Sequence, residues 1–197
     1  MYMGKIYFTS DTHFCHNKDF CYEPRGFKTI EEMNETIFNN WNSIVTDEDD
    51  IYHLGDVMLN DDTQGMMYLE NLKGKIHIIR GNHDTDTRVE KYKQLNNVVE
   101  ITYATIIKYG KTHLYLCHYP TLTANYDDDK PWHKNLVNLF GHTHQQENFY
   151  NNNPYMYHVG VDSHNCKPIE VEEILEEIRQ KKIELNNERM KKTELPD

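Results

Sequence analysis

Long hydrophobic runs are missing from the sequence: none approaches the roughly 20 apolar residues that a membrane-spanning helix requires. Residues 1–5 lead directly into a strand-like stretch, without the apolar core of a signal peptide. The glycine-rich phosphate loops GxxxxGKS/T and GxGxxG are absent as well. These absences argue against a membrane protein and against a P-loop or dinucleotide-binding enzyme, and we expect a cytoplasmic protein with no membrane partner.

Cysteine is scarce, and basic side chains are outnumbered by acidic ones. The four cysteines, Cys15, Cys21, Cys117 and Cys166, form no CxxC pair and have no zinc-finger spacing, so we expect reduced thiols that pack as small hydrophobes. Lys and Arg number 21 against 32 Asp and Glu, which gives a formal charge of -11. Duplex nucleic acid and anionic membranes are bound through clustered basic residues, so the charge argues against both as partners.

The composition is otherwise that of a folded protein. The 197 residues favour one domain, and 38% of them are hydrophobic, with 14 Tyr, 7 Phe and 2 Trp. We expect a single domain over residues 1–185 and a charged, frayed tail over residues 186–197. Twelve histidines are present, and because histidine is the commonest metal ligand, their positions are the main indication of function.

The first half of the chain alternates between strand and helix patterns. Thr29 and Glu32 form a capping-box pair ahead of apolar residues at three- and four-residue spacing, which predicts a helix. A weaker helix is predicted over residues 62–72. Strands are predicted over residues 5–10, 51–54 and 75–79. Strands that alternate with helices indicate the parallel crossover units of an α/β protein.

The second half contains strands that follow one another without helices between them. We predict strands over residues 98–101, 104–109, 112–117, 136–140 and 155–161. A turn at Gly110 and Lys111 joins the second and third of these as a hairpin. Apolar residues from Ile169 to Ile178 predict a final helix. This arrangement favours a mixed sheet, or two sheets packed face to face with helices outside.

Five short polar clusters each follow a predicted strand. They are Asp11-Thr12-His13, Gly55-Asp56, Gly81-Asn82-His83-Asp84, His118 and Gly141-His142-Thr143-His144. Each cluster alone is a weak signal, because such short combinations arise often by chance. All five lie where α/β proteins place their sites, at the carboxyl ends of strands, and chance does not explain five in succession. Glycine ahead of three clusters lets the backbone turn sharply and approach the site closely.

The side chains of these clusters form a coherent set of metal ligands. Carboxylate, imidazole and amide groups without thiolate suit two divalent ions of intermediate softness, such as Mn, Fe, Co, Ni or Zn. Asp11 and His13 are two residues apart and can point the same way in an extended turn, as can His142 and His144. Two metals about 3.5–4 Å apart can clamp the attacking and leaving oxygens of a displacement at phosphorus. The clusters therefore point to metal-dependent phosphoester hydrolysis.

The five clusters, in this order, resemble the signature of the calcineurin-like metallophosphoesterases. The resemblance runs from about residue 4 to residue 162, and no signature residue is missing. Further likeness to the small single-domain bacterial and phage members lies in residues 10–17, 33–42 and 159–162. The resemblance implies an α/β protein built as a four-layer α/β/β/α sandwich with two mixed β-sheets, the metallophosphoesterase fold.

The resemblance also implies residue roles. One metal would be held by Asp11, His13 and His144, the other by Asn82, His118 and His142, with Asp56 bridging both. A hydroxide that bridges the metals, its pKa lowered by the two cations, would attack phosphorus. His83 would stabilise the transition state or protonate the leaving oxygen, and Asp84 would orient His83. We expect two divalent transition metal ions, Mn²⁺ first, with Fe, Ni, Co or Zn as alternatives.

Residues outside the five clusters have weaker claims to function. His16, Asn17 and Arg25 could bind substrate phosphate, and Arg25 would do so through its planar guanidinium. An ordinary solvated arginine in a loop is an equally good interpretation of Arg25. Asp162 could support a ligand histidine, but a loop-stabilising role is favoured. The remaining histidines are expected to be structural or to face solvent. They are His53, His77, His113, His158 and His164, and His133 within residues 119–135.

The substrate is the least determined part of the prediction. Residues 119–135 carry Tyr119, Tyr126, Trp132 and His133 between two clusters, so aromatic rings near the mouth of the site could stack on a nucleobase, although packing within the loop is favoured. Because no cap is evident, we favour a phosphodiesterase on small or nucleotide-type phosphoesters over a phosphomonoesterase with the same site. A binding module that had lost catalysis would lack ligands or His83, and a mononuclear zinc protein would not explain so many ligands. The oligomeric state is left open.

Overall fold

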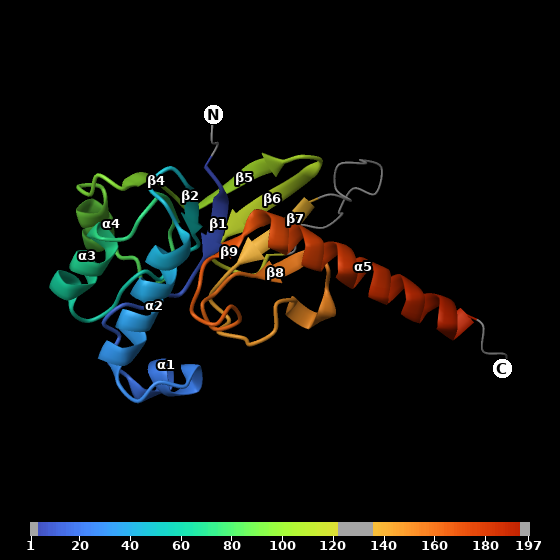
Figure 1. Cartoon of the computed structure of the whole chain (residues 1–197), viewed down its shortest axis with the longest axis horizontal. Coiled ribbons are helices and arrows are strands. Elements are labelled where there is room, and N and C mark those ends of the chain that lie inside the picture. The colour runs from blue at the N-terminus through green and yellow to red at the C-terminus, as the bar shows by residue number, and fades with distance from the viewer. Residues whose placement is uncertain (1–3, 122–135, 194–197) are drawn as a thin grey trace.

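The computed structural model describes residues 4–121 and 136–193, and two β-sheets run through them (Figure 1). The larger sheet has the strand order β4-β3-β2-β1-β9. Its strands are β1 (Ile6–Thr9), β2 (Asp50–His53), β3 (Lys75–Ile79), β4 (Val98–Thr102) and β9 (Ile169–Glu170). Strands β1 to β4 are parallel, whereas β9 pairs antiparallel with β1, so the sheet is mixed.

The smaller sheet has the strand order β5-β6-β7-β8. Its strands are β5 (Ala104–Tyr109), β6 (Thr112–Cys117), β7 (Leu136–Phe140) and β8 (Met156–His158). β5 and β6 form an antiparallel hairpin whose turn contains Gly110, at a φ of 56° that glycine adopts readily. β6, β7 and β8 are parallel, so this sheet is mixed as well.

Helices α2 (Ile30–Ile44), α3 (Asp62–Glu70) and α4 (Asp86–Tyr92) cover one face of the larger sheet (Figure 1). The capping residue Thr29 accepts a hydrogen bond at Oγ1 from the backbone N–H of Glu32 at 3.2 Å, as the sequence predicts. The Glu32 carboxylate in turn accepts from the backbone N–H of Lys28 at 3.0 Å, one residue before the usual capping-box donor.

A second core lies between the two sheets. It joins Phe8, Leu54 and Ile79 from the larger sheet to Leu116 and Leu139 from the smaller one, and all five side chains are buried. Burying both faces of parallel strands is what allows them to be apolar on both sides. The sheets therefore pack face to face, and the loops at their carboxyl ends are brought together.

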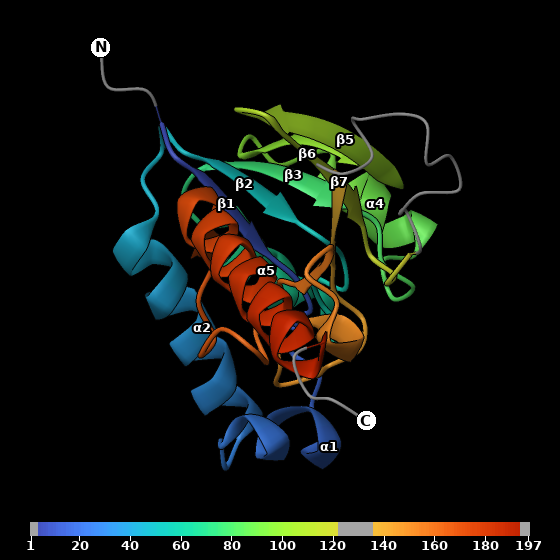
Figure 2. The same ribbon diagram turned by 90° about the vertical axis from the view of Figure 1, so that its right-hand side faces the viewer.

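Helix α5 (Val171–Thr193) joins this second core from the side opposite to α2, α3 and α4, and Figure 2 shows it crossing in front of β1. Its buried side chains Val171, Ile174 and Ile178 pack against the sheets. The hydroxyl of Tyr157 in β8 donates to the carboxylate of Glu177 at 2.9 Å, which fixes the helix to the smaller sheet. The C-terminal half of α5 extends away from the body of the protein (Figure 1).

The predicted α/β fold with two mixed sheets and helices on both sides is confirmed. The expected helical start at Ile169 is wrong, because Ile169 pairs with Phe8 in β9 and α5 begins only at Val171. The expected fraying of the tail is also wrong as far as Thr193, because the Glu, Lys and Arg residues of this stretch are good helix formers. Neither α4 nor the short α1 (Asp19–Tyr22) was predicted. The single domain over residues 1–185 stays a prediction.

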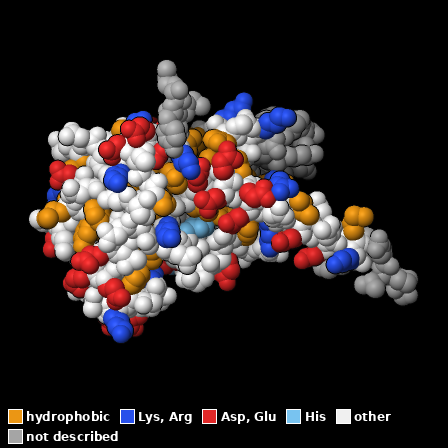
Figure 3. All heavy atoms as spheres, in the orientation of Figure 1, with side chains coloured by type: hydrophobic (Ala, Val, Ile, Leu, Met, Phe, Trp, Pro, Cys, Tyr) orange, Lys and Arg blue, Asp and Glu red, His pale blue; other side chains and the backbone are white. Residues whose placement is uncertain are grey.

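Charge and hydropathy of the surface agree with the composition. On the face drawn in Figure 3, acidic and basic side chains are interspersed and form no continuous basic track. In the part of the chain that the structure describes, no helix is both long and apolar enough to cross a membrane.

Candidate metal centre and active site

The loops that follow five strands meet at one end of the two sheets. Asp11 and His13 follow β1, Asp56 follows β2, Asn82, His83 and Asp84 follow β3, His118 follows β6, and His142 and His144 follow β7. Backbone hydrogen bonds join the loops within each sheet: the N–H of Asp11 donates to the carbonyl of Gly55 at 2.9 Å, and that of Gly141 to His118 at 2.9 Å. Across the sheets, the N–H of His142 donates to Oδ2 of Asp11 at 2.9 Å.

Several candidate ligands have a left-handed backbone, which non-glycine residues seldom adopt. Their φ angles are 56° for Asp11, 47° for His13, 58° for Asp56, 66° for His142 and 48° for His144. Each such residue costs on the order of 1–3 kcal/mol, and such strain collects at functional sites. The extended turn expected from the sequence is therefore wrong at these residues, although Asp11 and His13 still offer ligand atoms to one group.

One group of candidate ligands consists of Asp11, His13 and His144. Oδ1 of Asp11 lies 3.7 Å from Nε2 of His13 and 3.8 Å from Nε2 of His144. Asp11 and His13 come from the larger sheet and His144 from the smaller one, so the group spans both sheets.

A second group consists of Asp56, His118 and His142. Oδ2 of Asp56 lies 3.5 Å from Nε2 of His118, and the side-chain oxygen of Asn82 lies 3.1 Å from the same nitrogen. Oδ2 of Asp56 is also 3.6 Å from Nε2 of His13, a member of the first group. A single carboxylate oxygen therefore lies between the two groups.

The polar atoms of this centre fit divalent cations. Oδ1 of Asp11 and both ring nitrogens of His13 are buried and have no hydrogen-bond partner. Leaving such atoms unsatisfied costs about 1–3 kcal/mol each, whereas a cation would accept a lone pair from Oδ1 of Asp11 and one from Nε2 of His13. Oxygen and imidazole donors without thiolate suit first-row divalent ions.

Hydrogen bonds orient two of the histidines with Nε2 toward the centre. Nδ1 of His118 lies 2.7 Å from the carbonyl oxygen of Leu54, so it donates there and leaves the lone pair of Nε2 free. Nδ1 of His144 lies 3.0 Å from Oδ2 of Asp162, with the same consequence. Asp162 thus supports a candidate ligand, which is one of the two alternatives raised by the sequence.

Arg25 holds Asp162 in place. Its Nε and Nη2 donate to the two carboxylate oxygens of Asp162 at 2.8 and 3.1 Å, and Nη2 also donates to the carbonyl of Asp11 at 2.8 Å. The Arg25 side chain is only 1% exposed. The prediction that Arg25 binds substrate phosphate is therefore wrong, because its guanidinium is buried and already engaged behind the ligands.

Burial shifts the pKa values of the centre. It lowers the pKa of His13 to about 4, against the opposing effect of Asp11. It also lowers the pKa of His142 and raises that of Asp56 to about 6. Burial acts to raise the pKa of Asp11, yet the neighbouring His13 and the charges of nearby histidines hold that pKa well below its usual range. Imidazoles that stay neutral keep the lone pair that a metal requires.

Asp84 does not orient the His83 ring, and this prediction is wrong. The Asp84 side chain is buried and accepts four hydrogen bonds from elsewhere. The donors are the backbone N–H groups of Asp56, Val57 and Gly81 at 2.8, 3.1 and 2.8 Å and the hydroxyl of Tyr92 at 3.1 Å. Asp84 therefore ties the loops after β2 and β3 to α4.

His83 lies at the surface of the centre. Its side chain is 42% exposed, and its Nε2 lies 3.9 Å from Oδ2 of Asp56. The backbone N–H of His83 donates to Oδ1 of Asp56 at 2.8 Å, and its carbonyl accepts from Nη1 of Arg88 at 2.7 Å. The backbone is thus fixed while the imidazole faces the solvent side of the carboxylate.

A cleft of about 250 Å³ opens beside the centre. His13, His83, His144 and Asp162 line one part of it, and His16 belongs to its wall, so a substrate contact for His16 stays a prediction. Asn17 is exposed and does not line this cleft, so the structure does not bring it to the site with His16.

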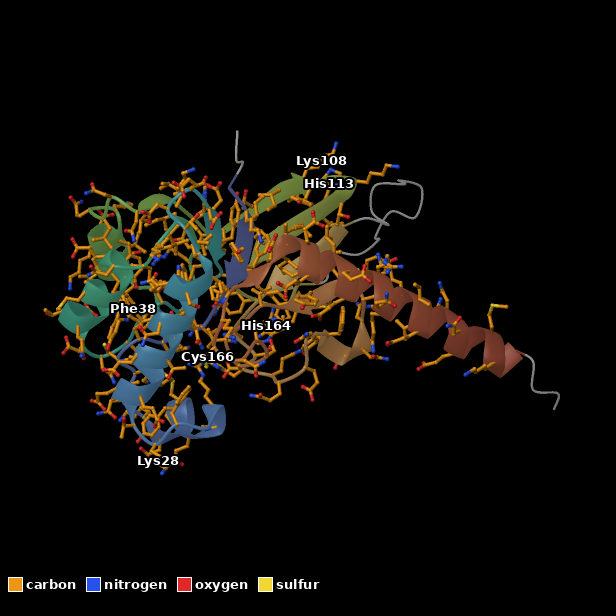
Figure 4. The ribbon with its side chains drawn as sticks, in the orientation of Figure 1. Lys28, Phe38, Lys108, His113, His164 and Cys166 are labelled. Atoms are coloured by element: carbon orange, nitrogen blue, oxygen red, sulfur yellow. The ribbon has the colours of Figure 1, made fainter. Side chains whose placement is uncertain are left out.

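Other residues singled out in the sequence have identifiable positions. Tyr119 is 44% exposed, and its ring lies 4.8 Å from that of His142, a member of the second group of candidate ligands. Tyr126, Trp132 and His133 lie outside the described residues. Four of the remaining histidines have structural contacts. These are His53 with Thr12 at 2.9 Å, His77 with Asp50 at 2.9 Å, His158 with Ser163 at 2.8 Å and His164 with the carbonyl of His158 at 2.9 Å. His113 lies on the β5–β6 hairpin, far from α1 (Figure 4).

Three residues with roles at the centre were not predicted. The hydroxyl of Ser10 donates to Oδ2 of Asp11, and Tyr92 holds Asp84. Phe20 lines the cleft. Ser10 could have been found from its place at the carboxyl end of the first strand, whereas no pattern in the sequence distinguishes Phe20 or Tyr92.

Comparison with known proteins identifies the family. Residues 5–161 match the family model of the calcineurin-like phosphoesterase superfamily domain. The chain belongs to this family. The phosphoesterase is therefore a hydrolase of phosphoesters that depends on divalent metal ions, and the resemblance stated from the sequence motifs is confirmed.

Two curated relatives and one solved structure are similar to the phosphoesterase over different lengths of the chain. The uncharacterized protein MJ1445 from Methanocaldococcus jannaschii is 33% identical over 191 residues, which cover 93% of this chain and 96% of that protein. The Gene 66 protein of Mycobacterium phage L5 is 31% identical over 87 residues, 42% of this chain and 41% of that protein. Among solved structures, the protein of unknown function AQ665 from Aquifex aeolicus is 26% identical, with a TM-score of 0.65 and coverage of 88% of this chain and 98% of that one.

Proposed function

We propose that the phosphoesterase is a dinuclear metal-dependent phosphodiesterase that acts on small or nucleotide-type phosphoesters. The observation that carries this proposal is the position of Oδ2 of Asp56, 3.6 Å from Nε2 of His13 and 3.5 Å from Nε2 of His118. A carboxylate shared in this way suits two ions about 3.5–4 Å apart, the spacing of two-metal hydrolases.

The proposed ligands divide into two sets with one shared member. Asp11, His13 and His144 would hold one ion, Asn82, His118 and His142 would hold the other, and Asp56 would be shared by both. Mn²⁺ is the first choice for these oxygen and nitrogen donors, and Fe, Co, Ni and Zn are the alternatives to compare. When bound, two such ions would supply Lewis acidity toward phosphoryl oxygens and lower the pKa of water.

His83 is the proposed catalytic group on the protein side. Its Nε2 lies 3.9 Å from Oδ2 of Asp56 on a ring that is 42% exposed, so a phosphoester that enters the cleft meets this imidazole. The ring would donate its N–H to a phosphoryl oxygen or pass the proton to the leaving oxygen. A positioned acid of this kind contributes about 10²–10⁴-fold to the rate.

The preference for diesters rests on the openness of the site. His83 and His144 are both more than two-fifths exposed at the edge of the cleft, which leaves room for a second ester group beside the phosphorus. A phosphomonoesterase with the same ligands is the alternative, and the two activities separate by the ratio of diester to monoester turnover.

The test combines metal analysis with matched variants. Protein purified without chelator should carry close to two transition metal ions per chain and hydrolyse bis(p-nitrophenyl) phosphate faster than p-nitrophenyl phosphate. His83→Gln should retain the metals and lose about 10²–10⁴-fold in kcat, whereas Asp56→Asn should lose both metal and activity. His113→Gln, on the remote hairpin, is the control for loss of a histidine.

Three results would contradict parts of this proposal. Activity that persists after chelation, in protein without bound metal, rules out the dinuclear centre. Faster turnover of the monoester favours the phosphomonoesterase. Full activity of His83→Gln removes that residue from catalysis and leaves the metal assignment intact.

A further inference from the structure

The cleft continues beyond the candidate ligands to an apolar wall that the proposed chemistry does not use. Phe20, Cys21 and Pro24 line this part, and His16 lies between it and the centre. The ring of His16 is 5.3 Å from that of His13 and 5.4 Å from that of Phe20. A continuous row of rings thus leads from a metal ligand to an aromatic side chain at the mouth.

Phe20 is unusually exposed for a large apolar side chain. It is 73% accessible, whereas the neighbouring Cys21 is buried at 7%. The rings of His16 and Phe20 pack edge to face, at an interplanar angle of 84°. This contact covers only part of the phenyl ring, and the rest stays accessible. An exposed aromatic ring in a cleft that is also lined by candidate metal-binding residues is a feature of recognition sites.

The wall is held rigidly relative to the centre. Phe20 lies in α1, and the following turn ends at Arg25, whose buried guanidinium is bonded to Asp162 and to the carbonyl of Asp11. The backbone N–H of Cys21 donates to the carbonyl of Lys18 at 2.8 Å, which closes the turn that carries Phe20. The distance between the aromatic wall and the ligands is therefore fixed by a buried ion pair.

We propose that Phe20, with His16 and Pro24, forms a subsite for a flat aromatic group of the substrate, either an aryl ester or a nucleobase. Every such group has a π-face that stacks on an open phenyl ring, whereas a small alkyl ester cannot cover it. The subsite names the substrate class for the proposed phosphodiesterase and rests on that proposal. Phe20 acts in it as a specificity residue and takes no part in the chemical step.

Product-like monoesters test the subsite by binding alone. Methyl phosphate, phenyl phosphate and thymidine 5′-monophosphate share the phosphate and differ in the attached group. We expect calorimetry on the metal-loaded protein to give dissociation constants about fivefold to hundredfold lower for the two aromatic esters than for methyl phosphate. Phe20→Ala should abolish this difference and leave methyl phosphate unchanged, and Phe20→Trp should preserve it.

Met67→Ala is the matched control. Met67 in α3 is 62% exposed and lines a hollow with Phe38, which Figure 4 labels on α2. This variant therefore also removes an exposed apolar side chain but leaves the cleft unchanged. Tighter binding of both aromatic esters than of methyl phosphate indicates a general aryl subsite. Tighter binding of the thymidine ester alone indicates a nucleobase subsite, and either result supports the proposal.

The inference is overturned if wild type binds the three esters alike, or if Phe20→Ala weakens all three equally. Failure of the proposed function has a different signature, since a protein that hydrolyses no diester can still show the Phe20-dependent difference in binding. The two ideas are thus tested separately on the same preparation.

Discussion

Replacing Asp162 with asparagine tests whether the buried ion pair behind His144 supports the metal centre. The carboxylate of Asp162 accepts from Nε and Nη2 of Arg25 at 2.8 and 3.1 Å and lies 3.0 Å from Nδ1 of His144. Its side chain is 5% exposed. Burial acts to raise its pKa, yet His144 and Arg25 hold that pKa at about 2, so the group is ionised at every working pH.

The magnitude follows from removing one charge of a buried pair. Asp162→Asn leaves the Arg25 guanidinium buried without a counter-ion, which costs about 3–5 kcal/mol of unfolding free energy. In a chain of this size, each kcal/mol shifts Tm by about 2–4 °C, so we expect a decrease on the order of 10 °C. His144 also loses a charged acceptor at Nδ1, which should weaken metal binding at its group by about 10–100-fold.

Two assays separate these effects. Thermal unfolding of chelated protein measures the ion pair without metal, and calorimetric titration with Mn²⁺ measures the support of His144. Glu176→Gln is the matched control, because it removes the carboxylate of the Glu176–Arg179 pair, whose side chains are 54% and 60% exposed. Such a surface pair contributes little, so both readouts should match wild type. If Asp162→Asn leaves Tm and Mn²⁺ affinity unchanged, the assignment of the pair as a support is refuted.

Three further changes should each have a distinct effect. In Asp84→Asn the side chain can no longer accept four hydrogen bonds as a carboxylate, so the free energy of unfolding measured by urea titration should fall by about 2–5 kcal/mol. An unchanged midpoint of the urea transition would refute the role of Asp84 in joining the loops. Burial lowers the pKa of His53 to about 4, so about 3 kcal/mol of the free energy of unfolding, fully present above pH 6.5, should be lost as the pH falls to 4. His53→Gln should flatten this pH dependence in thermal melts recorded at several pH values. A Cβ at Gly141 would overlap Oγ of Ser10 and Oδ2 of Asp11, so Gly141→Ala should lose bound metal by elemental analysis, and full occupancy would contradict this packing.

The candidate ligands were predictable because their signal is local. Asp11 and His13 directly follow a strand, and their spacing alone indicated that both could point into one site. The left-handed backbone of both residues is not visible in the residue types, since aspartate and histidine adopt it less readily than glycine.

The errors concern contacts between distant parts of the chain. Arg25 and Asp162 are 137 positions apart, and no local pattern pairs them, so neither alternative raised by the sequence for Arg25, phosphate binding or a solvated loop position, includes this buried ion pair. Asp84 adjoins His83 in sequence, but its carboxylate turns toward backbone donors of other loops. Ile169 has the spacing of the helix that follows, and a two-residue strand is too short to reveal its own period.

Each group of candidate ligands draws side chains from both sheets, and this has a mechanical consequence. Asp11 and His13 belong to the larger sheet and His144 to the smaller, while Asp56 belongs to the larger and His118 and His142 to the smaller. An ion in either group would therefore cross-link the two halves of the sandwich. Occupancy of the centre stabilises the native state by about 1.4 kcal/mol for every tenfold excess of metal over its dissociation constant. We therefore expect metal binding to slow amide hydrogen exchange in the strands that face each other across the two sheets, so that this exchange reports how much of the centre is occupied.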